Sequence, residues 1–378
     1  MNEIGPSNML RRSTHRGWCS GPAALAAVLF ISVPVALVIG SASASAAPRV
    51  FNAPAQVVAG TTSLNGIACH GHDNCVAVGS DDGEGVVVPI TDGVPGTAQL
   101  VAGPDTLSAV SCPTTTYCVA VGTGPYSNPP EPTQAAGYVV PITDGTPTGA
   151  NVVPGMGMPG APDQVYLYGV GCISATSCWA VGSSAYLGDV ILPIGSQNLE
   201  TVAQGYGLQG VACRDNTCIA AGNGDVTSRK YPYGEGIAVA IADGKAASLG
   251  GTPGAQTLNG VACRSSAWCL AVGSNAHDST EGVVVLVISQ EIRNAVLVPG
   301  SAVLYGVGCR HVTQVDCVAV GSGSNEGVVA LIYDGTPGTA HAVAGSDELS
   351  GVACPTSTSC LVVGGNSSDE GVLATVRL

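Results

Sequence analysis

The sequence predicts an all-β protein, a seven-bladed β-propeller of four-stranded antiparallel blades, and three observations carry that prediction. A short unit with two cysteines recurs seven times, with leading leucines 41 to 60 residues apart. Each copy is followed by valine-rich runs bounded by glycine, proline and Asp-Gly, which is typical of strands and hairpins. The last copy ends one strand short, whereas one extra strand-like run precedes the first copy.

The repeated unit reads "LNGIACHGHDNCVAVG" in its first copy, residues 64 to 79, and the copies begin near residues 64, 107, 167, 208, 258, 304 and 349. In each copy we expect strand a to end at the first cysteine and strand b to begin at the second. The run "EGVVVPITDG" (84 to 93) predicts strand c, and "TAQLVAG" (97 to 103) predicts strand d. Four strands per copy match one propeller blade.

The two ends of the chain indicate how the ring closes. The seventh repeat stops at "EGVLATVRL" (370 to 378), after strand c, and "AQVVAG" (55 to 60) matches the strand d sequence. We therefore expect the N-terminal strand to complete the last blade, which removes an exposed sheet edge.

Three prolines conflict with this strand assignment. Pro89, Pro141 and Pro193 fall inside strand c, which has neighbours on both sides. Because proline cannot donate a ladder hydrogen bond, we expect a β-bulge there in the first three blades.

Residues 1–46 read as a signal peptide, and residues 47–378 as the propeller. Arg11, Arg12 and Arg16 precede an apolar run at residues 22–40, and small residues then lead to a cleavage site before Ala47. An uncleaved membrane anchor through residues 22–40 is the alternative. Either reading predicts a secreted or extracellular location.

The charge distribution excludes one class of partner. The chain carries a formal net charge of −14, with no lysine or arginine between Val50 and Cys213. Such a surface repels phosphate backbones, so we expect no nucleic-acid binding. We expect a monomer without a cofactor, whose partner is an extracellular glycan, peptide or protein.

All cysteines except Cys19 lie in pairs within the repeats. Strands a and b should form a hairpin that places the two cysteines opposite each other, and an exported chain should oxidise them. Such small rings stabilise by roughly 2 to 2.5 kcal/mol each. A zinc site would need four ligands and a redox pair a C-x-x-C motif, and neither pattern recurs. The predicted disulfides are Cys69–Cys75, Cys112–Cys118, Cys172–Cys178, Cys213–Cys218, Cys263–Cys269, Cys309–Cys317 and Cys354–Cys360.

The unit "L-x-G-V-x-C … C-x-A-V-G … G-V-V-x-P-I-x-D-G" resembles the repeat of Asp-box (BNR-like) propellers. It is most similar to the photosystem II assembly-factor-like branch and to cysteine-bearing versions in secreted actinobacterial proteins. The resemblance implies structural Asp-box turns at Asp92-Gly93, Asp144-Gly145, Asp243-Gly244 and Asp334-Gly335. It also implies a protein that binds or scaffolds, with the sialidase-like members as the enzymes.

Two acidic or histidine-containing loops invite a metal hypothesis. His70, His72 and Asp73 lie in one short loop, and "SDDGEG" (80 to 85) clusters three carboxylates. The first loop offers too few ligands and the second lacks the spacing of a calcium loop. We therefore interpret both as solvated turns and expect no metal site.

The second residue of each strand a is polar or amphipathic, although its neighbours are leucine and glycine or alanine. Since strand a is innermost in a propeller, these residues should surround the mouth of the central channel. Tyrosines, amides and hydroxyls together suit a sugar or a peptide; a merely solvated channel is the plainer interpretation. The seven candidates are Asn65, Ser108, Tyr168, Gln209, Asn259, Tyr305 and Ser350.

Two function classes remain open. The first is a non-catalytic binding or scaffolding propeller, and the alternative is an extracellular glycosidase or lyase with carboxylates on the loop face. No catalytic residues can be assigned. The irregular loops at residues 122–137, 154–169 and 223–236 are the expected place for binding contacts, on the face opposite the disulfides.

Overall fold

The computed structural model describes residues 51–72, 74–125, 135–153, 164–185, 187–196, 200–202, 205–224, 234–242, 245–276, 280–310 and 317–378. The chain divides into Met1–Ala47 and Pro48–Leu378, and the described residues belong to the second unit. They form seven antiparallel sheets, the predicted blades, and contain no helix. No described element is therefore a helix that could cross a bilayer.

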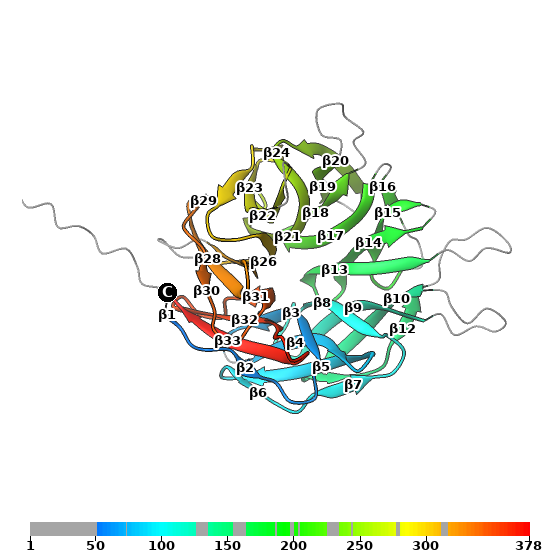
Figure 1. Cartoon of the computed structure of the whole chain (residues 1–378). Helices are drawn as coiled ribbons and strands as arrows, with labels where there is room; N and C mark the ends of the chain where they lie inside the picture. The colour runs from blue at the N-terminus through cyan, green and yellow to red at the C-terminus, as the bar shows by residue number, and fades with distance from the viewer. Residues whose placement is uncertain are drawn as a thin grey trace, which may run out of the picture. The chain divides into compact units, whose positions relative to one another are not determined.

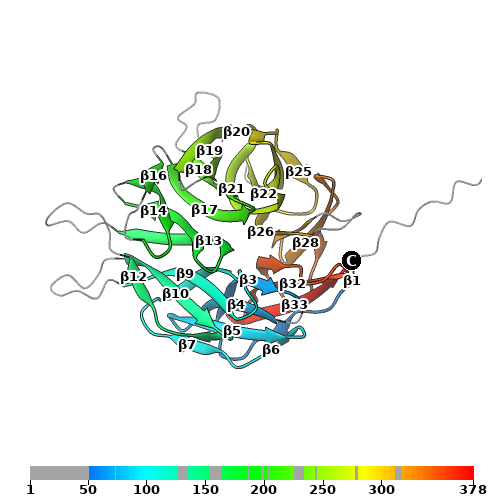
Figure 2. The same ribbon diagram turned by 180° about the vertical axis from the view of Figure 1, so that it is seen from behind.

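Each sheet is one repeat, and its strands run from the centre to the rim (Figures 1 and 2). The innermost strands are β3 (Ser63–His70), β8 (Thr106–Ser111), β13 (Val165–Ser174), β17 (Gly205–Arg214), β21 (Ala255–Ser265), β26 (Val303–Cys309) and β31 (Glu348–Ala353). Each contacts the innermost strand of the next blade, and β31 contacts β3. The ring is closed, as the sequence predicts.

The two middle strands of each blade are long and largely buried because valine and alanine occupy both faces. The second strands are β4 (Asn74–Asp81), β9 (Tyr117–Pro125), β14 (Ser177–Ser184), β18 (Thr217–Gly224), β22 (Trp268–Asn275), β27 (Cys317–Ser322) and β32 (Ser359–Gly365). The third strands are β5 (Glu84–Thr91), β10 (Ala135–Thr143), β15 (Gly188–Pro193), β19 (Glu235–Ala242), β23 (Gly282–Ile288), β28 (Gly327–Tyr333) and β33 (Gly371–Arg377). Their side chains form apolar clusters between adjacent blades.

The outer strand is broken into two short pieces in five blades, which the sequence pattern does not predict. The pieces are β6 (Val94–Pro95) with β7 (Gln99–Val101), β11 (Thr146–Pro147) with β12 (Asn151–Val153), β24 (Glu291–Ile292) with β25 (Val296–Val298), and β29 (Thr336–Pro337) with β30 (His341–Ala342). In the seventh blade β1 (Phe51–Asn52) and β2 (Gln56–Val57) take this position and pair with β33. Blades three and four have single outer strands, β16 (Glu200–Val202) and β20 (Lys245–Thr252).

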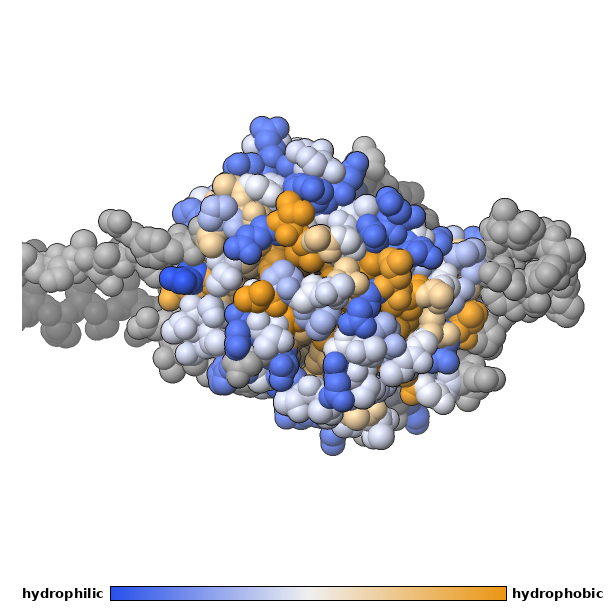
Figure 3. Space-filling model, turned by 90° about the horizontal axis from the view of Figure 1, so that it is seen from below, coloured by the Kyte–Doolittle hydropathy of each residue, from blue (hydrophilic) through white to orange (hydrophobic). Residues whose placement is uncertain are grey.

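The rim leaves apolar side chains exposed on these short pieces. Val94 and Leu100 are 66% and 56% exposed, and Val57 on β2 is 50% exposed. Figure 3 looks at this side of the molecule and shows apolar patches separated by polar side chains. The outer strands therefore bury one face only.

The prediction of a β-bulge at the strand c prolines is wrong. Pro89 pairs with Val76, and the register between β4 and β5 is continuous. The Pro89 carbonyl oxygen accepts from the Gly96 N–H on the outer side, so the missing N–H of Pro89 faces the same side. The outer strand leaves the ladder between β6 and β7, so no donor is required there.

Each predicted cysteine pair is a disulfide, with Cα atoms 3.9 to 4.0 Å apart. The first cysteine also packs against the preceding blade, because Cys112 Sγ lies 3.8 Å from the Ala68 carbonyl oxygen and Cys263 Sγ lies 3.9 Å from that of Ala212. The disulfides thus close the hairpins and fill the blade junctions. Seven disulfides are typical of proteins from oxidising compartments.

The c–d hairpin turns of blades one, two, five and six have positive φ at both central residues. Asp92 and Gly93 show φ values of 52° and 76°, as expected for a tight Asp-Gly hairpin. In blade five the same two positions are Ser289 and Gln290, with φ values of 51° and 66°. Because a side chain disfavours this region, the blade five turn is strained.

We expect Gln290→Gly to stabilise the protein by about 1 kcal/mol, since glycine adopts positive φ without a steric penalty. Urea unfolding of the disulfide-intact protein measures the change. The reciprocal variant Gly93→Gln should destabilise by a similar amount. A Gln290→Gly protein no more stable than the parent would contradict the assignment of strain to this turn.

We expect deletion of residues 47–60 to lower the melting temperature and the solubility, because β33 would lose its outer partners and become an exposed edge. Val57→Ala is the matched control, since that side chain is half exposed and should matter little. Thermal unfolding and light scattering report the two effects. A truncated protein that melts like the full chain would show that the N-terminal strands do not hold the ring closed.

Candidate functional site

Every innermost strand carries a β-bulge at the same position of its repeat. The ladder between strands a and b shifts register by one residue directly after the leading leucine, for example between Leu64 and Gly66. The extra residues are the seven sequence-predicted candidates, Asn65, Ser108, Tyr168, Gln209, Asn259, Tyr305 and Ser350. A bulge redirects a side chain away from the alternating pattern.

A glycine on strand b makes this bulge possible. Leu64 is paired with Gly79, and a Cβ added to Gly79 would collide with the Ser63 carbonyl oxygen. The same collision recurs at the six equivalent glycines, Gly122, Gly182, Gly222, Gly273, Gly321 and Gly364. The glycine that recurs at this position in all seven repeats therefore lets strand a approach closely while leucine enters the core.

The seven bulge residues converge on one pocket of about 190 Å³ at the centre of the ring. Below them the lining continues with glycine or alanine and then with valine or isoleucine, so that one tripeptide per blade forms the wall. The structure thus brings all seven predicted residues together. We name these seven residues the channel-mouth ring.

The pocket lining is uncharged. Among the described residues, its titratable side chains are the phenols of Tyr168 and Tyr305. Neutral hydroxyls, amides and aromatic faces suit hydrogen bonding and stacking with a neutral polar ligand. Glycoside hydrolysis usually employs a pair of carboxyl groups, which the described lining does not provide.

The members of the channel-mouth ring are not equivalent. Asn65 Nδ2 donates to the Leu107 carbonyl at 2.9 Å, and Asn259 Nδ2 donates to the Leu304 carbonyl at 2.9 Å. Both bonds link adjacent blades, so these two amides are structural clamps with their side-chain oxygens still available. The sequence pattern alone does not separate the clamps from the other ring members.

The two tyrosines also differ. The Tyr168 ring stacks on Tyr166 with centroids 6.4 Å apart, and its hydroxyl lies 3.3 Å from Ser183 Oγ. Tyr305 has no hydrogen-bond partner among the described residues, and the same holds for the side chains of Ser108, Gln209 and Ser350. These four side chains keep all of their hydrogen-bonding groups available to a ligand.

Beside the ring lies a buried carboxyl group that the sequence reading did not identify. Asp189 is 0% exposed; its Oδ1 accepts from the Gly207 N–H at 2.7 Å, and its Oδ2 has no partner among the described residues. The other six blades have glycine at this position of strand c. Asp189 fits because the next blade has Gly205, where a Cβ would collide with the carboxylate. An aspartate at a position where the other six repeats have glycine is the sequence feature that could have identified this site.

Burial raises the pKa of Asp189 from 3.8 to about 6, and the Gly207 N–H opposes that rise. A carboxyl group whose pKa is higher in the folded state than in the unfolded state binds its proton more tightly when folded. It contributes stability below pH 4 and loses that contribution as the pH rises to 6.

The two predicted solvated turns lie away from the channel-mouth ring. His72 is exposed, Asp73 lies outside the described residues, and His70 Nδ1 is 3.3 Å from the Cys112 carbonyl oxygen. Asp82 and Gly83 form a tight turn with positive φ between β4 and β5. No group of three potential metal ligands occurs in the described part of the chain.

The predicted variable loops contain residues 126–134, 154–163 and 225–233, which lie outside the described residues. Their part in binding stays a prediction. The same applies to the signal peptide and to the anchor at residues 22–40.

Comparisons with known proteins support the fold. No family model and no curated protein matches the chain. Among solved structures, a streptogramin B lyase matches with a TM-score of 0.56 and 9% identity, covering 87% of this chain and 98% of that one. YCF48 from Cyanidioschyzon merolae matches with a TM-score of 0.51 and 15% identity, covering 86% and 99%. At such identities the likeness concerns the propeller fold alone.

We expect Asp189→Asn to gain stability relative to the parent protein as the pH rises from 4 to 7, by up to about 3 kcal/mol. Asparagine keeps the acceptor for Gly207 and removes the charge that burial disfavours. Urea unfolding at pH 4, 5, 6 and 7 measures the difference between the two proteins. Asp92→Asn, at an exposed turn, is the matched control for an Asp-to-Asn substitution outside the buried site. A difference independent of pH would contradict the assignment.

Proposed function

We propose that the protein is a non-catalytic binding module that takes a neutral polar ligand, part of an extracellular glycan or peptide, at the channel-mouth ring. The observation that carries this proposal is the convergence of seven bulge residues on one uncharged pocket. Four of them keep all of their side-chain hydrogen-bonding groups available. A bulge at one position in all seven blades presents side chains toward a single ligand.

The cellular context of the proposal is extracellular. Seven disulfides and an N-terminal segment with the features of a signal peptide support secretion, with anchoring through residues 22–40 as the second possibility. The repeat motif supports a place among Asp-box (BNR-like) propellers, near the photosystem II assembly-factor-like branch. We propose a monomer that binds its partner through the loop face.

The glycosidase or lyase alternative requires carboxylates on the loop face. Asp189 is fully covered, and it is the only acidic residue among the buried side chains that the structure describes. Binding is therefore the better-supported function, and the experiment below separates the two.

Purified protein should retain one or more cell-wall polymers or peptides in a pull-down screen without converting them. Tyr168→Ala combined with Tyr305→Ala should reduce that binding at least about tenfold, because stacked aromatic contacts are lost. The double variant should melt close to the parent protein.

Asn65→Ala combined with Asn259→Ala is the contrasting variant, because it removes two interblade bonds and should lower the melting temperature. Retained ligand binding in the tyrosine variant would exclude the channel mouth as the site. Steady release of products from a screened polymer would favour the enzyme instead.

A further inference from the structure

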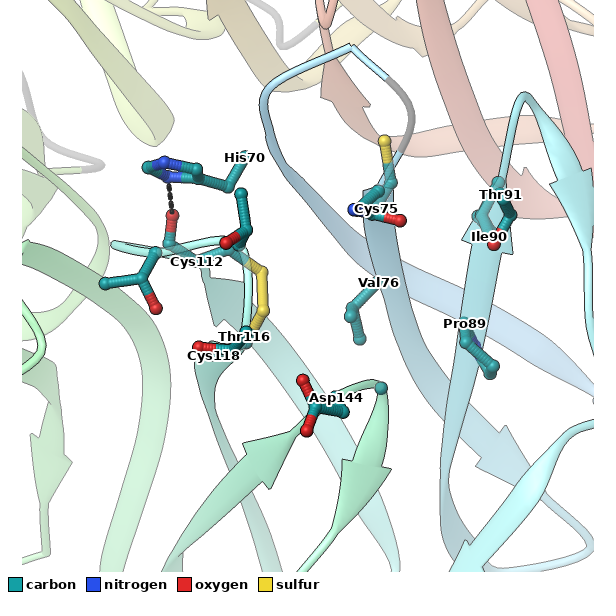
Figure 4. A pocket seen from close by; sticks show the side chains of 14 residues that line it. His70, Cys75, Val76, Pro89, Ile90, Thr91, Cys112, Thr116, Cys118 and Asp144 are labelled. Carbon is teal, nitrogen blue, oxygen red and sulfur yellow. Dashed lines mark hydrogen bonds between the residues drawn. A yellow bond between two sulfur atoms is a disulfide. The ribbon is translucent and has the colours of Figure 1, made fainter.

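At the disulfide end, the junction between blades one and two contains a pocket of about 310 Å³. Blade one contributes the ends of β3, β4 and β5, and blade two contributes the Cys112–Cys118 hairpin loop and the Asp144-Gly145 turn. Figure 4 shows His70 and Asp144 at different ends of it, with the disulfide between them. We name this pocket the blade 1–2 groove.

The groove is open at a junction where two side chains are smaller than their equivalents in blade five. Trp268 and Leu286 pack into the cluster between blades five and six. Their equivalents in blade one are Asn74 and Pro89, which both line the groove. Large side chains also pack at three further junctions, Tyr117 between blades two and three, Trp179 between three and four, and Tyr333 between six and seven.

The groove has an aliphatic wall and several hydrogen-bond acceptors around it. Val76, Pro89 and Ile90 supply the wall. Asp144 and the hydroxyls of Thr91 and of threonines 114–116 supply acceptors. Asp144 is the only acidic side chain among the described residues that line the groove.

We propose that the blade 1–2 groove binds a lysine or arginine side chain of a partner polypeptide. The aliphatic stem lies along Val76, Pro89 and Ile90, and the cationic head binds the Asp144 carboxylate and the threonine hydroxyls. The net charge of −14 attracts a basic partner over a distance. Two disulfides, Cys69–Cys75 and Cys112–Cys118, bound the groove and limit its rearrangement on binding.

This site is separate from the channel-mouth ring, which lies at the opposite end of the inner strands. The ring residues precede the valines of strand a, whereas the groove begins at the cysteines that end it. Loss of one site should therefore leave the other intact.

The probe is the blocked tripeptide acetyl-Gly-Lys-Gly-amide, titrated into the 15N-labelled protein and followed by NMR. We expect shifts of the amides of Thr115 and Gly145 that saturate at millimolar peptide and weaken with salt. The matched peptide with norleucine in place of lysine keeps the stem and lacks the charge. It should bind at least about tenfold more weakly.

Two variants locate the site. Asp144→Asn should weaken lysine-peptide binding at least about tenfold, whereas Asp334→Asn, at the equivalent turn of blade six, should leave it unchanged. Asn74→Trp should fill the groove and abolish the shifts at Thr115 and Gly145. Equal binding of both peptides, equal losses in the two aspartate variants, or no saturable shifts in the folded parent protein would each overturn the proposal.

Discussion

The close backbone approach of the seven innermost strands is the constraint on which the rest of the structure depends. A Cβ on Gly260 would lie 2.7 Å from the Tyr305 carbonyl oxygen, and one on Gly66 would lie 3.1 Å from the Ala109 Cα. Strands this close form a narrow ring with little room for side chains between them. The chain therefore uses glycine and valine where larger residues would force the blades apart.

The close packing of the innermost strands also explains why the channel mouth is polar. In each strand a, the leucine packs in the core and the glycine or alanine two residues later packs against the innermost strand of the next blade. The residue between them is the extra residue of the β-bulge. That residue belongs to neither packing surface, so polar side chains are tolerated there in all seven repeats. Function at this site would use a position that the fold already leaves free.

Deviations from the repeat mark the places where adjacent blades fit differently. Asp189 replaces a glycine and is accommodated by Gly205 of the next blade. Asn74 and Pro89 stand where blade five has Trp268 and Leu286, and they line the open blade 1–2 groove. In both cases the side chains of one repeat pack against the next repeat. The disulfides keep each hairpin fixed while such junctions vary.

The sequence by itself determined the blade number, the strand order, the cysteine pairing and the membership of the channel-mouth ring. These features follow from local patterns, because alternation, Asp-Gly turns and cysteine spacing act within one hairpin. Ring closure by β1 and β2 was also readable, since the missing strand and the extra strand match.

Only the tertiary structure decided how the pieces meet. It placed the bulges at Asn65 and its equivalents rather than at Pro89, because the proline nitrogen faces a break in the outer strand. It also showed that the Asn259 amide bonds to the next blade, whereas the Tyr305 hydroxyl is available to a ligand. It further showed that Asp189 is fully buried. The clamp at Asn259 and the burial of Asp189 depend on contacts with a neighbouring repeat, and no pattern within a single repeat specifies those contacts. The placement of Pro89 depends on where the outer strand of its own blade breaks.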